Sequence, residues 1–130
     1  MKALAEFPAL QRRHIRNLLC DIDDTLTTDG RLTAAAYGAL ESLHIAGIRV
    51  VPVTGRPAGW CDHIARMWPV DAVVGENGAF YFRYDHVTRG TIRRCAGDEA
   101  MRKQHRAQLN PIASDTLAAV PGCAIAADQQ

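Results

Sequence analysis

Residues 15–30 read IRNLLCDIDDTLTTDG, an apolar run that ends in a cluster of acidic side chains. Such a run, bounded by polar turn residues, is typical of a strand that is buried on both faces of a parallel sheet. Asp21 and Asp23 stand two residues apart at the end of the predicted strand, where open α/β sheets bind their ligands. The segment therefore predicts an α/β fold with a site at this strand end.

The acidic cluster predicts a bound cation. Asp21, Asp23 and Asp24 lie within four residues and repel one another, and a cation would relieve that repulsion. Carboxylate oxygens suit a hard ion such as Mg²⁺. A helix-capping or turn-forming aspartate cluster, with calcium as another cation it could hold, is the alternative interpretation.

A second polar motif, VPVTGRP, covers residues 51–57. The hydroxyl of Thr54 is followed by Gly55, which lets the backbone approach a ligand, and a helix can open at Pro57. Because a helix N-terminus favours negative charge, this strand end predicts a small anion site. An ordinary strand–turn–helix junction could carry the same letters.

Helices and strands alternate through the first 78 residues. Thr33 can cap a helix that runs to about Ala46 and ends at Gly47. Pro52 lacks an amide hydrogen, so we expect it near a strand end or on a side without a hydrogen-bond demand. The other predicted elements are a strand over 48–53, a helix over 57–67 and a strand over 70–74. This β-α-β-α-β order predicts a parallel sheet with right-handed crossovers.

The pattern changes past residue 78. Residues 79–84 and 88–94 alternate like a hairpin, and residues 98–119 look helical, with Pro111 able to interrupt them. Residues 124–126 can begin another strand. We therefore place a domain boundary near residue 79.

The run Asp21-x-Asp23-x-Thr25, preceded by an apolar strand, resembles the first motif of the haloacid dehalogenase (HAD) superfamily of phosphohydrolases. The resemblance implies that Asp21 attacks phosphorus and becomes an aspartyl phosphate. It also implies that the Asp21 carboxylate and the Asp23 backbone carbonyl bind Mg²⁺. The Asp23 side chain would protonate the leaving alcohol, which requires a raised pKa that the crowded carboxylates could supply. Thr25 would support the loop by hydrogen bonding.

The same resemblance extends to two further strand ends. Thr54 corresponds to the second motif and would bind the transferring phosphoryl group, assisted by the Gly55 amide. Arg56 completes the T-G-R form of members with large caps and would bind substrate or lock the loop. The GENGA segment, residues 75–79, resembles the C2-capped, Cof-like (HAD-IIB) sugar-phosphate phosphatase branch. Glu76 and Asn77 would contact substrate there; a glycine turn stabilised by the asparagine is the alternative.

The resemblance is strong over residues 15–79 and weak after them. Lys103 lies in the predicted helix without the setting of a third-motif lysine, and no late acidic run follows. We therefore expect a partial HAD-like Rossmannoid core with a parallel sheet over residues 1–78. Residues 79–130 would begin a truncated α+β C2-type cap. An N-terminal fragment of this kind should have weak or absent activity alone, and its unpaired sheet edge could support self-association.

The expected function is that of a Mg²⁺-dependent phosphomonoesterase acting on a small phosphorylated metabolite, with a sugar phosphate favoured. A non-catalytic interaction module and a phosphomutase with the same two aspartates are the alternatives. The net charge of +1 favours neither nucleic acid nor membrane as a partner. Four cysteines without a C-x-x-C pair, and the lack of a secretory signal, favour reduced thiols in a cytoplasmic protein.

Overall fold

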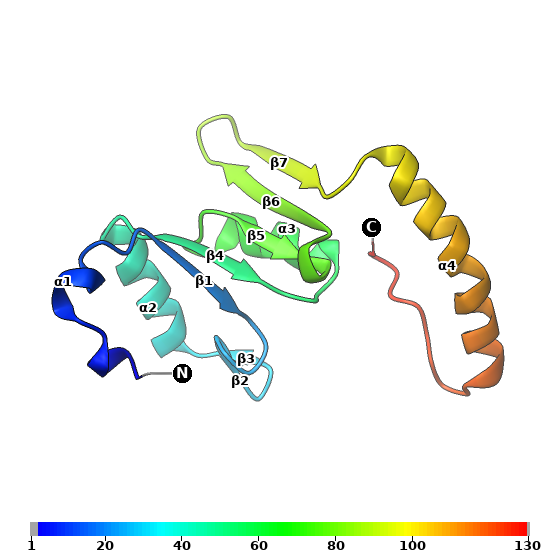
Figure 1. The fold of residues 1–130 in the computed structure, drawn as a ribbon, viewed down its shortest axis with the longest axis horizontal. Helices are drawn as coiled ribbons and strands as arrows, with labels where there is room; N and C mark the ends of the chain where they lie inside the picture. The colour runs from blue at the N-terminus through cyan, green and yellow to red at the C-terminus, as the bar shows by residue number, and fades with distance from the viewer. Residues whose placement is uncertain (1–2, 130) are drawn as a thin grey trace.

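The fold is built on one five-stranded sheet, which the computed structural model shows within residues 3–129, the part of the chain that it describes. The strand order is β1-β4-β5-β6-β7, with the first three strands parallel and the last two antiparallel to their neighbours (Figure 1). The strand bounds are β1 Asn17–Asp21, β4 Arg49–Val53, β5 Val73–Gly75, β6 Phe80–Asp85 and β7 Gly90–Cys95. The predicted α/β class with a parallel sheet is confirmed.

Two crossover helices have the bounds that local signals predict. In α2, Ala34–Ile45, the Thr33 hydroxyl accepts a hydrogen bond from the Ala36 amide at 3.2 Å. Gly47 follows this helix with a φ of +73°, a value that favours glycine. Helix α3, Ala58–Met67, begins directly after Pro57.

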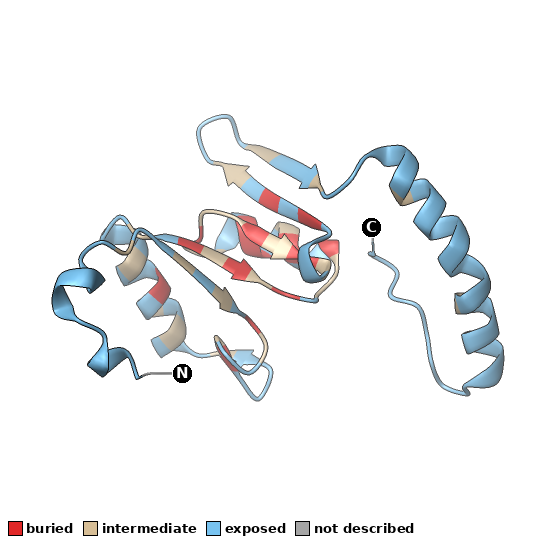
Figure 2. Ribbon diagram, in the orientation of Figure 1, coloured by how far each residue is buried: buried red, intermediate tan, exposed pale blue. Residues whose placement is uncertain are grey.

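Both crossover helices cover the same face of the sheet, and the core lies between them and the strands. The buried cluster includes Leu40 from α2, Ala58, Cys61, Ile64 and Ala65 from α3, and Val50, Val73, Phe80 and Phe82 from the strands. Figure 2 shows these buried positions concentrated in the sheet and its two helices. Because strand side chains alternate, the neighbours of these strand residues face away from the helices.

The strand that carries Asp21 lies at the edge of the sheet. The prediction that this strand is buried on both faces is wrong. β1 pairs with β4 on one side only, and its residues are exposed or half-buried, with Leu19 66% exposed. The expectation is wrong because no further strand flanks β1 in the described residues and the helices cover one face only. The unpaired edge expected for this strand is present.

A side chain shifts one other predicted boundary, the start of β5. β5 begins at Val73 rather than at residue 70, because the Asp71 carboxylate accepts the Val50 amide at 2.9 Å and replaces a strand hydrogen bond. The even-numbered amides of β4 point toward β5, so the missing amide hydrogen of Pro52 falls beside the start of that short strand.

The C-terminal segment confirms the predicted helix but not the predicted strand. Helix α4, Glu99–Ala119, runs through Pro111 without interruption and has no buried residue. The predicted strand at 124–126 is wrong, because these residues pair with no other strand and remain exposed. None of the helices in the described part of the chain combines the length and hydropathy of a bilayer crossing.

Several short elements were not predicted. Strands β2, Thr27–Thr28, and β3, Arg31–Leu32, form a small hairpin after β1. A single helical turn, η1, covers Leu4–Glu6, and α1 covers Ala9–Arg12. A further turn, η2, covers Glu76–Gly78. These elements depend on turns too short to leave a periodic signal in the sequence.

The predicted boundary near residue 79 falls between two paired strands. Gly75 of β5 is registered with Phe80 of β6, so residues 80–95 extend the same sheet. In contrast, α4 projects away from the sheet (Figure 1). The division into residues 1–78 and 79–130 therefore stays a prediction.

Candidate functional site

The two predicted motifs meet at the carboxyl edge of the parallel strands. Asp21 ends β1 and is registered with Val53, the last residue of β4. Thr54 follows directly, and its amide donates to the Val74 carbonyl of β5 at 2.9 Å. Parallel pairing thus brings segments more than 30 residues apart to one edge of the sheet.

The loop after β1 is held by one backbone carbonyl. The Ile22 carbonyl accepts the amides of Thr25, Leu26 and Thr27 at 3.3, 3.0 and 2.9 Å. The buried Thr27 hydroxyl also donates to this carbonyl at 3.0 Å and accepts the Asp24 amide at 3.3 Å. Thr25 therefore supports the loop through its backbone amide. The supporting hydroxyl belongs to Thr27, which was not among the predicted residues.

An ion pair joins the two motifs. Arg56 Nε donates to the two carboxylate oxygens of Asp23 at 3.2 and 3.1 Å, and Arg56 Nη2 donates to Oδ1 at 2.6 Å. This is the fork-shaped geometry in which arginine binds a carboxylate most strongly. The Asp23 side chain is 45% exposed, so the pair is open to solvent on one side. Arg56 locks the two loops together, which is one of its two predicted roles.

Trp60 gives the Arg56 side chain a platform. The Arg56 guanidinium carbon lies 4.4 Å from the centre of the Trp60 ring, within the range of a cation–π interaction. Trp60 lies in the first turn of α3, and Arg56 directly precedes Pro57, the N-cap of that helix. Arg56 lies outside the helix, so helical spacing could not have identified Trp60 as part of the site.

The ion pair sets the protonation of Asp23. Its hydrogen bonds from Arg56, with the nearby positive charge, hold the pKa of Asp23 below its ordinary value. The expected raised pKa is wrong in this arrangement, because the carboxylate is well exposed and has a cation rather than another acid as its partner. Asp23 is therefore ionised while Arg56 holds it.

The third strand end packs against the second. The Asn77 amide donates to the Thr54 carbonyl at 3.1 Å, and the Glu76 amide donates to the Arg56 carbonyl at 3.2 Å. A Cβ added to Gly55 would lie 3.3 Å from the Asn77 side-chain oxygen, so glycine permits this close approach. Both Glu76 and Asn77 have a positive φ, of 47° and 54°. Hydrogen bonds or packing thus connect the predicted residues of the second and third strand ends with Asp23, and strand pairing places Asp21 beside Val53.

Thr54 is enclosed by this arrangement. Its residue is 2% exposed, and its hydroxyl accepts the Arg56 amide at 3.1 Å. Asp21, in contrast, is exposed at the tip of β1. The threonine hydroxyl therefore organises the loop that presents Arg56, and Asp21 has a side chain that an incoming molecule can reach.

The donor set at this edge fits a hard cation only in part. The Asp21 carboxylate and the Asp23 backbone carbonyl are oxygen ligands of the kind that Mg²⁺ prefers, and Mg²⁺ commonly keeps several waters. Within residues 3–129, no cluster of three or more His, Cys, Asp or Glu side chains could hold a metal ion. The chain supplies part of an acidic shell at this position.

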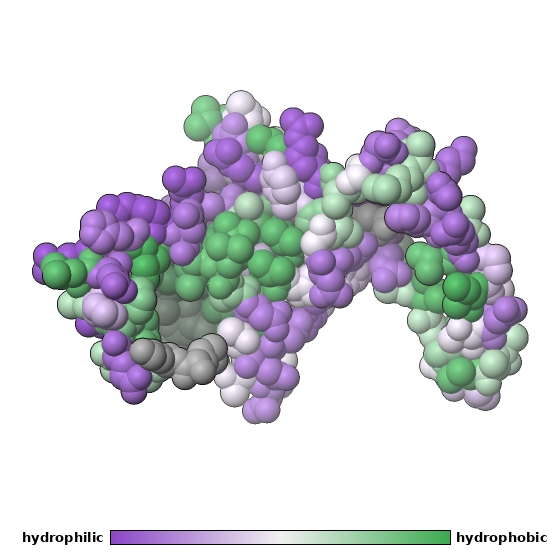
Figure 3. Space-filling view, viewed as in Figure 1, coloured by the Kyte–Doolittle hydropathy of each residue, from purple (hydrophilic) through white to green (hydrophobic). Residues whose placement is uncertain are grey.

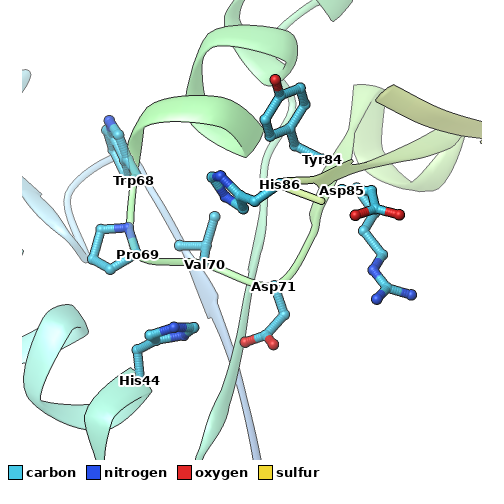
Figure 4. Close-up of a pocket in the computed structure, with 9 residues that line it drawn as sticks. His44, Trp68, Pro69, Val70, Asp71, Tyr84, Asp85 and His86 are labelled. Atoms are coloured by element: carbon cyan, nitrogen blue, oxygen red, sulfur yellow. The ribbon is translucent and has the colours of Figure 1, made fainter. Parts of the chain in front are cut away.

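Two cavities lie away from this edge. One, of about 250 Å³, lies at the opposite ends of the strands, where His44, Asp71 and His86 contribute to its lining (Figure 4). The other, of about 680 Å³, is lined by residues 3–15 near the N-terminus. Neither of these two cavities is lined by a predicted site residue.

The sequence matches the family model of haloacid dehalogenase-like hydrolases over residues 18–102. A curated relative, a phosphoglycolate phosphatase of Methanoculleus marisnigri, is 32% identical over 98 residues, which are 74% of this chain and 40% of the relative.

Solved structures give a similar result. One is a Bacteroides thetaiotaomicron protein studied among phosphatases of the haloalkanoate (HAD) superfamily; it has 27% identity and a TM-score of 0.51, with 75% of this chain and 36% of that chain covered. A haloacid dehalogenase-like hydrolase of the same organism has a TM-score of 0.55 at 16% identity, with 80% and 37% covered, and supports the fold alone. The chain thus spans about 40% or less of the length of these relatives.

Proposed function

Because the chain belongs to the haloacid dehalogenase-like hydrolase family, we propose that it carries the nucleophile half of a Mg²⁺-dependent phosphomonoesterase. The observation that supports this most directly is the meeting of Asp21, the Asp23–Arg56 pair and Thr54 at one edge of the sheet. An exposed carboxylate at the same sheet edge as an arginine is an arrangement suited to phosphoryl transfer.

In the proposed reaction, Asp21 is the nucleophile. A carboxylate oxygen of Asp21 attacks phosphorus, the bond from phosphorus to the alcohol oxygen breaks, and an aspartyl phosphate forms. The departing alcohol oxygen takes a proton from Asp23. Asp23 then accepts a proton from water as the water attacks phosphorus, which releases phosphate and restores Asp21. Dividing the displacement in this way replaces one difficult step with two easier ones.

Asp23 and Arg56 would change partners during this sequence. Arg56 holds Asp23 ionised in the free chain. A phosphate dianion competes for the same guanidinium fork, since arginine binds phosphate and carboxylate with similar geometry. Once Arg56 turns to the phosphoryl oxygens, the pKa of Asp23 rises beside the charge of Asp21 and of the substrate. Asp23 can then serve as a proton donor.

The proposed cofactor is Mg²⁺, held by the Asp21 carboxylate and the Asp23 backbone carbonyl. When bound, the ion supplies positive charge that offsets the charge on the phosphoryl oxygens. The partial acidic shell supports the further proposal that the chain alone binds the ion weakly and has weak or absent phosphatase activity.

The proposed substrate is a small phosphorylated metabolite, with a sugar phosphate as the favoured class. The family match and the phosphoglycolate phosphatase relative both support a small phosphate ester. In this proposal residues 79–130 begin a C2-type cap, and Glu76 and Asn77 contact substrate at its base. A cytoplasmic location is also proposed, because all four cysteines are free thiols.

Trapping the nucleophile tests the proposal. We expect beryllofluoride with Mg²⁺ to form an adduct on Asp21, detected by fluorine NMR, and Asp21→Asn to abolish it. Asp29→Asn is the matched control, because Asp29 lies in the adjoining hairpin turn and has no proposed role in the chemistry. An adduct that survives Asp21→Asn would contradict the assignment.

A phosphomutase would share the same two aspartates. Supplying a phosphorylated sugar and following phosphate release separates the two activities, because a mutase returns the phosphoryl group to its product. Equal consumption of ester and release of inorganic phosphate is the result expected here.

A further inference from the structure

One face of the sheet is left uncovered by the described helices. Helices α2 and α3 pack on the face that carries Val50 and Val73, and neither α1 nor α4 has a buried residue. On the opposite face Leu19 is 66% exposed. Tyr81 of β6 and Ile92 of β7 are each about two-fifths exposed. Figure 3 shows a hydrophobic area at the centre of the molecule, flanked by hydrophilic side chains.

The strand register arranges this face in a row with charge at its two ends. The row crosses all five strands because each member is registered with the next: Asp21, Val53, Val74, Tyr81 and Arg94. Registered residues point to the same face of a sheet. An acid therefore stands at the β1 edge and an arginine at the β7 edge, with three apolar residues between them.

This row is complementary to itself. A two-fold axis parallel to the strands and passing over β5 reverses the order of the row in the second copy. Asp21 then faces Arg94 of the partner, Val53 faces Tyr81, and Val74 faces its own copy. Two sheets that pack face to face lie about 10 Å apart with nearly aligned strands, which this axis provides.

The next row has the same property. Leu19 is registered with Val51 at one side of the sheet, and Arg83 is registered with Ile92 at the other. The same axis places Leu19 over Ile92 of the partner and Val51 over the aliphatic stem of Arg83, which can keep its charged head in water. Both rows therefore match apolar groups with apolar groups.

We propose that two copies of the chain associate face to face through this surface, related by a two-fold axis parallel to the strands. The proposal requires only the folded sheet, but the dimer engages Asp21, the proposed nucleophile. The same Asp21 carboxylate therefore cannot serve the dimer contact and the phosphatase chemistry at the same time. The proposal names a surface different from the open β1 edge, since edge pairing would leave the apolar rows exposed.

Sedimentation of the full chain tests this proposal. We expect a concentration-dependent mass that approaches two chains of 14.2 kDa and a dimer weakened by salt. Arg94→Glu places two acids opposite each other and should raise the dissociation constant at least about tenfold. Asp21→Arg should do the same by placing two cations together. The double variant Asp21→Arg/Arg94→Glu restores opposite charges and should return the constant to within about threefold of the original.

Arg93→Glu is the matched control. It makes the same charge change on the same strand, but Arg93 lies on the helix-covered face, 5.4 Å from the Phe82 ring. Circular dichroism of each variant confirms that it is folded. A wild-type chain that stays monomeric at several hundred micromolar would overturn the proposal and leave the face to a different polypeptide. A dimer that Arg94→Glu does not weaken would also overturn it, in favour of pairing through the β1 edge.

Discussion

Replacing Thr27 by valine should destabilise the loop that carries Asp23. Valine has the shape of threonine without the hydroxyl, so the change removes the bond to the Ile22 carbonyl and the bond from the Asp24 amide. The Ile22 carbonyl keeps three amide donors, but the Asp24 amide loses its acceptor. At about 0.5–1.5 kcal/mol for each hydrogen bond, and with some replacement by water at Asp24, we expect a loss of about 1.5 kcal/mol in the free energy of unfolding.

Urea denaturation followed by circular dichroism measures this loss. With a slope of about 1.5 kcal/mol per molar urea, the midpoint should fall by about 1 M. Thr28→Val is the control, because the neighbouring Thr28 is exposed and should change the free energy by less than about 0.5 kcal/mol. Equal midpoints for the two variants would refute the claim that the buried hydroxyl supports this loop.

Two further predictions concern the pKa of Asp23 and the free energy of unfolding of glycine variants. Arg56→Met should raise the pKa of Asp23, which carbon NMR of the Asp23 carboxyl group measures. Because Arg56 lowers the pKa of Asp23 in the folded chain, the ion pair stabilises the wild type at pH values above the ordinary pKa near 3.8. This stabilisation is lost as the pH falls through the folded-state pKa. An unchanged carboxyl titration in Arg56→Met would contradict the ion pair. Gly75→Ala should lower the free energy of unfolding by more than about 2 kcal/mol, because the added Cβ would lie 2.6 Å from the buried Cys61 sulfur. Gly38→Ala, at an open position on α2, should raise the free energy of unfolding by about 0.5–1 kcal/mol in the same urea assay.

Elements with local signals were predicted closely. Thr33 and Gly47 mark the ends of α2 through their own hydrogen bonding and backbone conformation, which neighbouring residues alone decide. The hairpin of β6 and β7 was likewise visible as alternating residues. The placement of both motifs at one sheet edge also followed from the sequence, because parallel strands joined by right-handed crossovers leave few arrangements.

Features that depend on distant partners were not predicted. The lowered pKa of Asp23 requires Arg56, which is 33 residues away in the sequence, and motif spacing gives no side-chain geometry. The late start of β5 depends on the Asp71 carboxylate reaching the Val50 amide. The exposure of β1 reflects which strands and helices surround it, and an apolar run alone cannot distinguish an edge strand from a central one.

The exposure of α4 has a consequence for its dynamics. A helix of 21 residues with no buried side chain receives little support from the rest of the molecule, and most of the stability of a helix in a protein comes from such packing. Pro111 also removes one amide, leaving the Ala107 carbonyl to solvent. The amide hydrogens of α4 should therefore exchange with deuterium far sooner than those of α3, so that this helix melts and reforms while the sheet stays intact.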